Sequence, residues 1–139
     1  MSYATQANMI ARFGEQELIQ LTDRADPAFE SVDAAVFAAD AARADGYVNG
    51  YLRTRYALPM VSPDIAVLTA AENVTRYYLY GNGAPQFVKD NFDESTAWLK
   101  LVQDGKVQLD AALAPASATG GAIGTAQFNE TYNDFSLAY

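Results

Sequence analysis

The sequence predicts an all-α fold: a small bundle of about four to five helices with one long central helix and an extended C-terminal arm. Apolar residues recur at the three- and four-residue spacing of helices through most of the first 109 residues. Proline and glycine fall between these segments, where helices begin and end. After Leu109 the composition changes abruptly to small residues. At 139 residues the chain fits one domain that can bury a core without disulfides or a structural metal.

Two short helices are expected near the N-terminus. Thr5 is a suitable N-cap for the first helix, and Gly14 ends it. A second helical segment starts at Glu15 and stops within residues 23–27. The apolar residues of the two segments are Met9, Ile10, Phe13, Leu18, Ile19 and Leu21.

A long helix is expected over residues 31–56, capped by Ser31. At 1.5 Å per residue it would be about 40 Å long. Gly46 and Gly50 lie inside it, although each interior glycine costs about 1 kcal/mol relative to alanine. Their four-residue spacing places both on one face, which favours a site of close helix packing within the chain, a local kink, or contact with a neighbouring subunit.

Two further helices complete the predicted body. Ser62 is expected to cap the fourth helix, with Pro63 at its first position and Gly81 at its end. Within it, Glu72 is placed to pair with Arg76 across one helical turn. The fifth helix is expected to start at Pro85 and to end at Gly105 in a left-handed conformation. Its apolar residues are Phe87, Phe92, Trp98, Leu99 and Val102.

The sequence divides into a helical domain, residues 1–109, and a C-terminal arm, residues 110–139. The arm begins with a stretch of mostly Ala, Gly, Ser and Thr, which has too few large apolar groups to form a core. No Lys or Arg follows Lys106. Four aromatic residues near the end are spaced so that a helix would place them on one side: Phe128, Tyr132, Phe135 and Tyr139. They are candidates for a docking element, or they fold back onto the body.

The residues offer little for catalysis or cofactor binding. Histidine and cysteine are absent, which excludes Ser-His-Asp and Cys-His centres and thiolate metal sites. Acidic clusters such as Asp90 with Asp93 and Glu94 are expected to be solvated helix surface, without the ligand pattern of a calcium loop. We therefore expect no catalytic, cofactor-binding or metal-binding residues, and no enzyme activity.

The charge and hydropathy of the chain exclude two further classes of partner. A net charge of -8 argues against duplex DNA binding, which needs clustered Lys and Arg. Arg53, Arg55 and Arg76 lie among tyrosines that could stack on single-stranded nucleic acid, but the simpler interpretation is tyrosines that close the core. No apolar run is long enough for a membrane helix, and the N-terminus lacks the pattern of a secretory signal.

Several segments resemble a known family. These are the opening Tyr3-Ala4-Thr5, then Arg12-Phe13-Gly14 with Glu17-Leu18, residues 51–59, and Arg76-Tyr77 with Leu79-Tyr80-Gly81. Together they are similar to the Mu-like phage head-tail connector proteins, over roughly residues 3–108. Asn8 stands where an acidic residue often follows the capping Thr, and Ala57 replaces a common proline. Asn8 lacks the charge that favours a helix N-terminus.

The resemblance implies a structural subunit of the head-tail neck of a virion, assembled in the bacterial host cytoplasm. Such adaptor or head-completion proteins form a ring, typically of twelve copies, between the portal protein and a tail-completion or tail-terminator protein. DNA passes through the ring without specific binding. The aromatics of the arm would then be the portal-docking residues, and acidic residues such as Asp40, Asp45, Asp90 and Asp93 are candidates to line the channel.

Two other functions remain open from the sequence. One is a soluble regulatory or protein-binding module that works as a monomer, which the mass of the protein with and without a portal would distinguish. The other is an enzyme that uses carboxylates such as Asp90 or Glu94.

Overall fold

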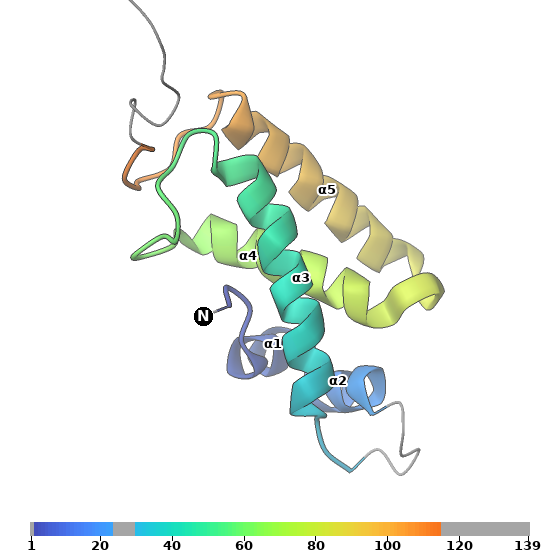
Figure 1. Ribbon diagram of the computed structural model, residues 1–139. Coiled ribbons are helices and arrows are strands. Elements are labelled where there is room, and N and C mark those ends of the chain that lie inside the picture. The colour runs from blue at the N-terminus through green and yellow to red at the C-terminus, as the bar shows by residue number, and fades with distance from the viewer. Residues whose placement is uncertain (1, 24–29, 115–139) are drawn as a thin grey trace, which may run out of the picture.

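The structure, a computed structural model, describes residues 2–23 and 30–114. These residues form five α-helices and one short 3₁₀ turn (Figure 1). The elements are α1 (Gln6–Phe13), α2 (Glu15–Thr22), α3 (Ala34–Leu52), α4 (Ile65–Tyr80), η1 (Gly81–Gly83) and α5 (Gln86–Gln103). The predicted all-α bundle is confirmed.

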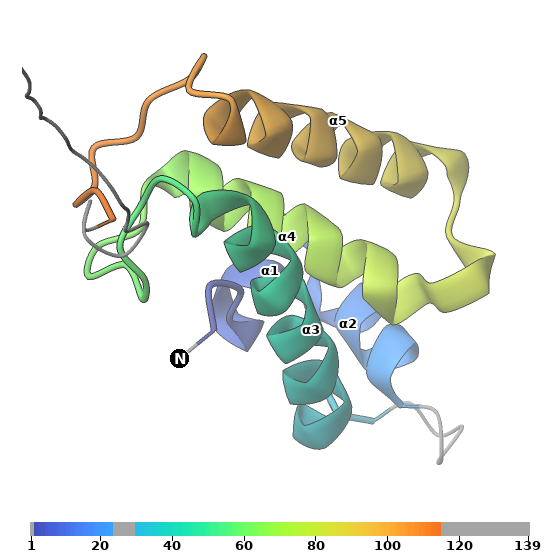
Figure 2. The ribbon, with the colours of Figure 1, turned by 45° about the horizontal axis from the view of Figure 1, so that its top comes forward.

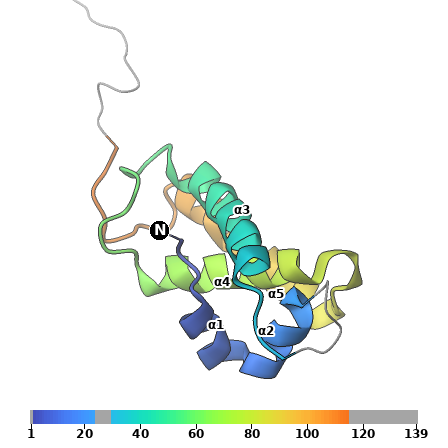
Figure 3. The same cartoon turned by 60° about the horizontal axis from the view of Figure 1, so that its bottom comes forward.

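The helices are arranged around α4. Helix α5 lies on one side of α4 and the α1–α2 pair on the other, while α3 crosses α4 (Figure 2). The main core lies among α3, α4 and α5, and its fully buried residues include Val48, Leu52, Val67, Leu99 and Val102. A second apolar cluster fixes α1 and α2 beneath α3 (Figure 3). Its buried members are Ala4, Met9, Leu18, Phe37, Ala41 and Leu79.

The two N-terminal helices begin and end as predicted. The Thr5 side chain accepts a hydrogen bond from the Asn8 N–H at 3.2 Å, which confirms it as the cap of α1. Gly14 has a φ of 96° and separates α1 from α2. Because this φ is strained for any residue with a side chain, glycine is what permits the turn between the two helices.

Helices α3 and α4 begin later than predicted, for a shared reason. Asp33, and not Ser31, caps α3 by accepting from the N–H groups of Ala35 and Val36. Asp64, and not Ser62, caps α4 by accepting from the Ala66 N–H. A carboxylate supplies both the acceptor and a negative charge that favours the helix N-terminus. In each case the acidic residue two positions after the serine is the cap.

Helix α3 also ends earlier than predicted, at Leu52, and is about 28 Å long. The chain turns after it, and Tyr56 forms an antiparallel bridge with Leu113. The Ala57 N–H donates to the Ala112 carbonyl at 2.9 Å, and the Ala114 N–H donates to the Arg55 carbonyl at 3.0 Å. Residues 110–114 therefore lie against the segment that follows α3. The division of the chain at residues 109 and 110 stays a prediction.

The end of α5 is as predicted. Gly105 has a φ of 80°, the left-handed conformation expected there. It also leaves room for a neighbour, because a Cβ at this position would lie 3.0 Å from Nη1 of Arg55.

Candidate interaction surfaces

Two ion pairs join the α1–α2 pair to α4. Arg76 of α4 donates from Nε and Nη2 to the two carboxylate oxygens of Glu17, at 2.6 and 2.8 Å. Arg12 donates from Nη1 to Glu72 Oε1 at 2.9 Å, and from Nη2 to Asn73 Oδ1 at 3.3 Å. The predicted pairing of Glu72 with Arg76 within α4 is therefore wrong, because each residue has a charged partner on another helix.

Aromatic rings cover the Arg76 guanidinium. Its Cζ lies 4.0 Å from the ring centroid of Phe13 and 5.2 Å from that of Phe87. Arg76 is only 9% exposed, whereas Phe87, one of the residues expected to form the apolar surface of the fifth helix, is 54% exposed. Cation–π contacts of this kind strengthen when the cation is partly desolvated. We call Arg12, Phe13, Glu17, Glu72 and Arg76 the clamp.

Several residues that carry the family resemblance are clamp residues or attach the N-terminus. Arg12, Phe13, Glu17 and Arg76 belong to the clamp, and Leu18, next to Glu17 in the chain, is fully buried. At the N-terminus, the Tyr3 hydroxyl donates to Asn49 Oδ1 at 2.6 Å and its N–H donates to Asp45 Oδ1 at 3.0 Å. These motifs thus hold the fold together.

A cluster of tyrosines lies among α3, α4 and α5. Tyr77 stacks on Phe92 with centroids 4.2 Å apart, and Tyr47 contacts Tyr51, Tyr78 and Phe92. The Tyr47 and Tyr51 hydroxyls lie 3.3 Å apart, and this hydrogen bond together with burial raises the pKa of Tyr51 from 10.0 to about 12.

These contacts test the hypothesis that the tyrosines stack on the bases of single-stranded nucleic acid. The rings are engaged with one another, and the Arg43 guanidinium covers Tyr78 at 4.5 Å. Tyr56 is buried, and its hydroxyl accepts from the Leu109 N–H at 2.8 Å. The tyrosines therefore close the core, as the simpler interpretation expected.

Gly46 and Gly50 lie on an exposed face of α3. A Cβ added at either position would meet no other atom of the described chain within 4 Å. Close packing against another part of the described chain does not explain them. Contact with a neighbouring subunit stays a prediction for this face.

The acidic residues considered for a channel lining are in two different environments. Asp40 is buried and lies 3.2 Å from the Arg43 guanidinium, and Asp45 accepts from the Tyr3 N–H. Both are held by contacts within the subunit. Asp90 and Asp93 are exposed on α5, where Asp90 accepts from the Gln86 side chain at 2.8 Å. Only the α5 pair is thus available to face a channel.

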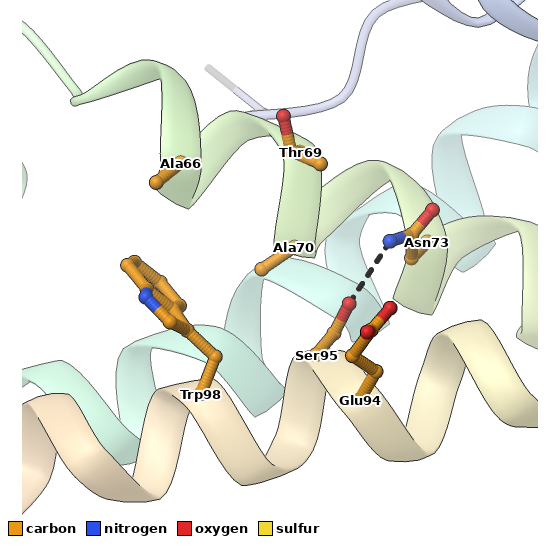
Figure 4. A pocket seen from close by; sticks show the side chains of 7 residues that line it. All are labelled: Ala66, Thr69, Ala70, Asn73, Glu94, Ser95 and Trp98. Carbon is orange, nitrogen blue, oxygen red and sulfur yellow. Dashed lines mark hydrogen bonds between the residues drawn. The ribbon is translucent and has the colours of Figure 1, made fainter.

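A groove of about 440 Å³ runs between α4 and α5 (Figure 4). Trp98 of α5 lies opposite Ala66 and Ala70 of α4, so small side chains leave space above the indole. At the other end, Asn73 Nδ2 donates to Ser95 Oγ at 3.0 Å, and Glu94 stands beside this pair. Sequence reasoning missed the groove, because Trp98 was counted only as part of the apolar surface of the fifth helix. The small residues facing the tryptophan were the available signal.

The predicted docking aromatics, Phe128, Tyr132, Phe135 and Tyr139, lie outside the described residues. Within the described part of the chain, no group of three or more carboxylates is placed to hold a metal ion. None of the helices described there has both the length and the apolar character needed to cross a membrane.

The fold and these surfaces define a small all-α protein. Several of the residues that carry the family resemblance pack its helices together or attach its N-terminus to α3. Residues 3–126 match the model of the family described as "Bacteriophage Mu, Gp36". The chain belongs to this family. It is also similar to gene product J of Escherichia phage Mu, with 29% identity over 106 residues, which cover 76% of this chain and 74% of that protein.

Proposed function

We propose that this chain is the head-tail connector subunit of a Mu-like phage, an adaptor or head-completion protein that forms a ring between the portal and the tail. The observation that carries the proposal is the family match over residues 3–126. It spans the whole described body and extends the resemblance stated from the sequence. The proposed ring has the twelve copies typical of the connectors that the chain resembles.

Features of the subunit support this role. The exposed α3 face at Gly46 and Gly50 has no neighbour within the described chain and is available for a second subunit. The net charge of -8 suits a ring through which DNA slides, because weak or repulsive contact with phosphates avoids retention. In this proposal the aromatic residues of the arm dock on the portal, and a few large anchors supply most of that binding energy.

Electron microscopy of the purified protein mixed with its portal tests the proposal. We expect a second ring stacked on the portal ring, whereas the protein alone stays monomeric or weakly associated at micromolar concentration. The portal is expected to act as the template, because its repeated sites raise the local concentration of subunits. The same protein mixed with the portal of an unrelated phage serves as the control.

A portal ring that remains bare at saturating protein would contradict the connector role and favour the monomeric protein-binding module. A stable ring of the free protein at low concentration would contradict the expectation of a monomeric free subunit, because the portal would then not be needed as a template.

A further inference from the structure

The groove between α4 and α5 opens toward the end of the body from which the chain continues past residue 114. Helix α4 begins and α5 ends at this end, where residues 110–114 lie beside the segment after α3 (Figures 1 and 2). Five large apolar residues are markedly exposed in the described chain, and four of them belong to segments at this end. They are Val61 (102%), Ile65 (78%), Leu101 (40%) and Leu113 (69%).

Two of these residues belong to the helices that form the groove. Ile65 lies one turn before Thr69 on α4, and Leu101 lies one turn after Trp98 on α5. The groove lies between the Asn73–Ser95 hydrogen bond and this end of the two helices, with Ala66, Ala70 and Trp98 in its lining. An apolar strip between two helices is the kind of surface that receives an amphipathic helix through anchors three and four residues apart.

We propose that the aromatic segment, residues 128–139 of the same chain, occupies this groove in the free subunit. Its aromatics are spaced by four, three and four residues, the anchor pattern of a helix bound in a groove. The 13 residues 115–127 can span up to about 45 Å. The groove lining on α4, from Ala66 to Asn73, extends over only about 10 Å.

Proximity favours the chain's own segment over any other occupant. A short connection gives a tethered segment an effective concentration of the order of millimolar. The segment carries Glu130 and Asp134 and no basic residue. We therefore expect these carboxylates to lie away from Glu94, the acidic residue of the groove lining.

If the chain is a connector, the groove and the portal would compete for the same aromatic residues. The aromatics would stay bound in the groove of the free subunit and would leave it when the portal binds them more tightly. The groove contact itself does not require the connector role. The experiment below uses the free subunit without portal, so its failure and the failure of the connector proposal are distinguishable.

Trp98 is the single tryptophan of the chain and reports directly on the groove. In the full-length protein, replacing all four aromatics of the segment with alanine should raise the acrylamide quenching of Trp98 roughly twofold and shift its emission to the red, because large rings that cover the indole are lost. Equal quenching and emission in the two proteins would contradict the proposal.

A spin label identifies the occupant. The chain has no cysteine, so Ser136→Cys gives one labelling site. In isotope-labelled full-length protein, the label should broaden the amide signals of α4 and α5 along the groove. The change Ala66→Arg fills the groove and should abolish this broadening, while the matched control Ala42→Arg on the exposed face of α3 should retain it.

The remaining outcomes are also decisive. If Ala66→Arg lowers the melting temperature, the wild-type broadening and the Trp98 quenching still test the proposal. Broadening confined to signals outside the groove, or none at all, would overturn it. So would broadening of isotope-labelled subunits only by spin-labelled subunits mixed with them, because the occupant would then be the segment of a second copy.

Discussion

Arg76 contacts side chains from three other helices: Glu17 of α2, Phe13 of α1 and Phe87 of α5. A nearly buried guanidinium with two charge-assisted hydrogen bonds leaves an uncompensated charge when its partner is removed. We expect Glu17→Gln to lower the free energy of unfolding by roughly 1–3 kcal/mol, a range reduced from that of a fully buried pair because Glu17 is partly exposed.

The coupling between Glu17 and Arg76 can be measured by urea denaturation of three variants. They are the single variants Glu17→Gln and Arg76→Met and the double variant that combines them. The double variant should lose less than the sum of the two single losses, because the residues act as one unit. Glu15→Gln, an exposed carboxylate on the same helix, is the matched control and should change stability by less than about 0.5 kcal/mol. Strictly additive losses would show that the pair contributes no coupling.

Tyr51 is expected to make the free energy of unfolding of the subunit decrease at alkaline pH. Its pKa is about 12 in the folded protein against an ordinary value of 10.0, because the hydrogen bond with Tyr47 and burial favour the neutral phenol. The folded state thus holds this proton more tightly than the unfolded state. The stabilisation is fully present below pH 10 and is lost as the pH rises toward 12.

Unfolding free energies measured across this pH range should therefore fall more steeply for the wild type than for Tyr51→Phe. A tyrosinate absorbance titration of the two proteins should show that the variant lacks a late-titrating group. Tyr80→Phe is a weaker control, since burial raises the pKa of Tyr80 too, without the Tyr47 contact. Identical slopes for the wild type and Tyr51→Phe would contradict the assignment.

At the scale of the element, α3 carries two glycines that its own subunit does not require. Neither has a positive φ, and an added Cβ meets nothing within 4 Å. Gly46→Ala and Gly50→Ala should each raise the free energy of unfolding of the isolated subunit by about 0.5–1 kcal/mol, because alanine restricts the unfolded chain and favours the helix.

The same two variants test the neighbouring-subunit interpretation. If α3 meets another subunit at this face, the double alanine variant should melt at a higher temperature yet assemble on the portal less well. Ala38→Ser, another small change at an exposed position of α3, serves as the control. Normal assembly of the stabilised double variant would remove this face from the ring interface.

Helix positions were readable from the sequence to the extent that local chemistry sets them. Thr5, Gly14 and Gly105 act within a single turn, and each was predicted correctly. The caps of α3 and α4 were missed because serine and aspartate compete as acceptors two residues apart, and the choice depends on how the loop enters the helix. The local sequence therefore predicts that a helix exists more reliably than it predicts the residue at which the helix begins.

At the scale of the whole molecule, the contacts between segments distant in the chain could not be predicted from the sequence. Nothing local shows that Arg76 pairs with Glu17, 59 positions away, or that Arg12 pairs with Glu72. The predicted pair at one-turn spacing was the local alternative, and the tertiary partners replaced it. The groove was hidden for the same reason, since it exists only where α4 and α5 meet.

The charge of the whole subunit leads to a prediction about DNA passage. If α5 faces the channel, Asp90→Asn with Asp93→Asn should slow DNA ejection without unfolding the subunit, because weaker repulsion allows phosphates to linger. Asp40 and Asp45 are unsuitable for this test, since their carboxylates stabilise the subunit. Glu15→Gln with Glu30→Gln removes the same charge from exposed sites elsewhere and is the control. Ejection at the normal rate in the α5 variant would exclude this lining.

The last prediction concerns the arm as a separable part of the molecule. The described body includes residues 110–114, which pair with the segment after α3, so the informative truncation removes residues 115–139 and keeps the Ala114 hydrogen bond to Arg55. Within the described residues, the two apolar cores are built from buried side chains between Ala4 and Leu109. The truncated protein should therefore keep its helical circular dichroism and cooperative melt, while Trp98 becomes more accessible to quenchers.

In the phage, the same truncation should give filled heads that fail to join tails, because the aromatic anchors for the portal are gone. A variant that keeps the arm but replaces only Phe128, Tyr132, Phe135 and Tyr139 with alanine should show the same defect, whereas a Ser136→Ala variant should not. If the truncated protein unfolds, the aromatics belong to the core of the subunit. If heads join tails at the normal yield, the arm is dispensable, and portal docking must depend on a surface of the helical body.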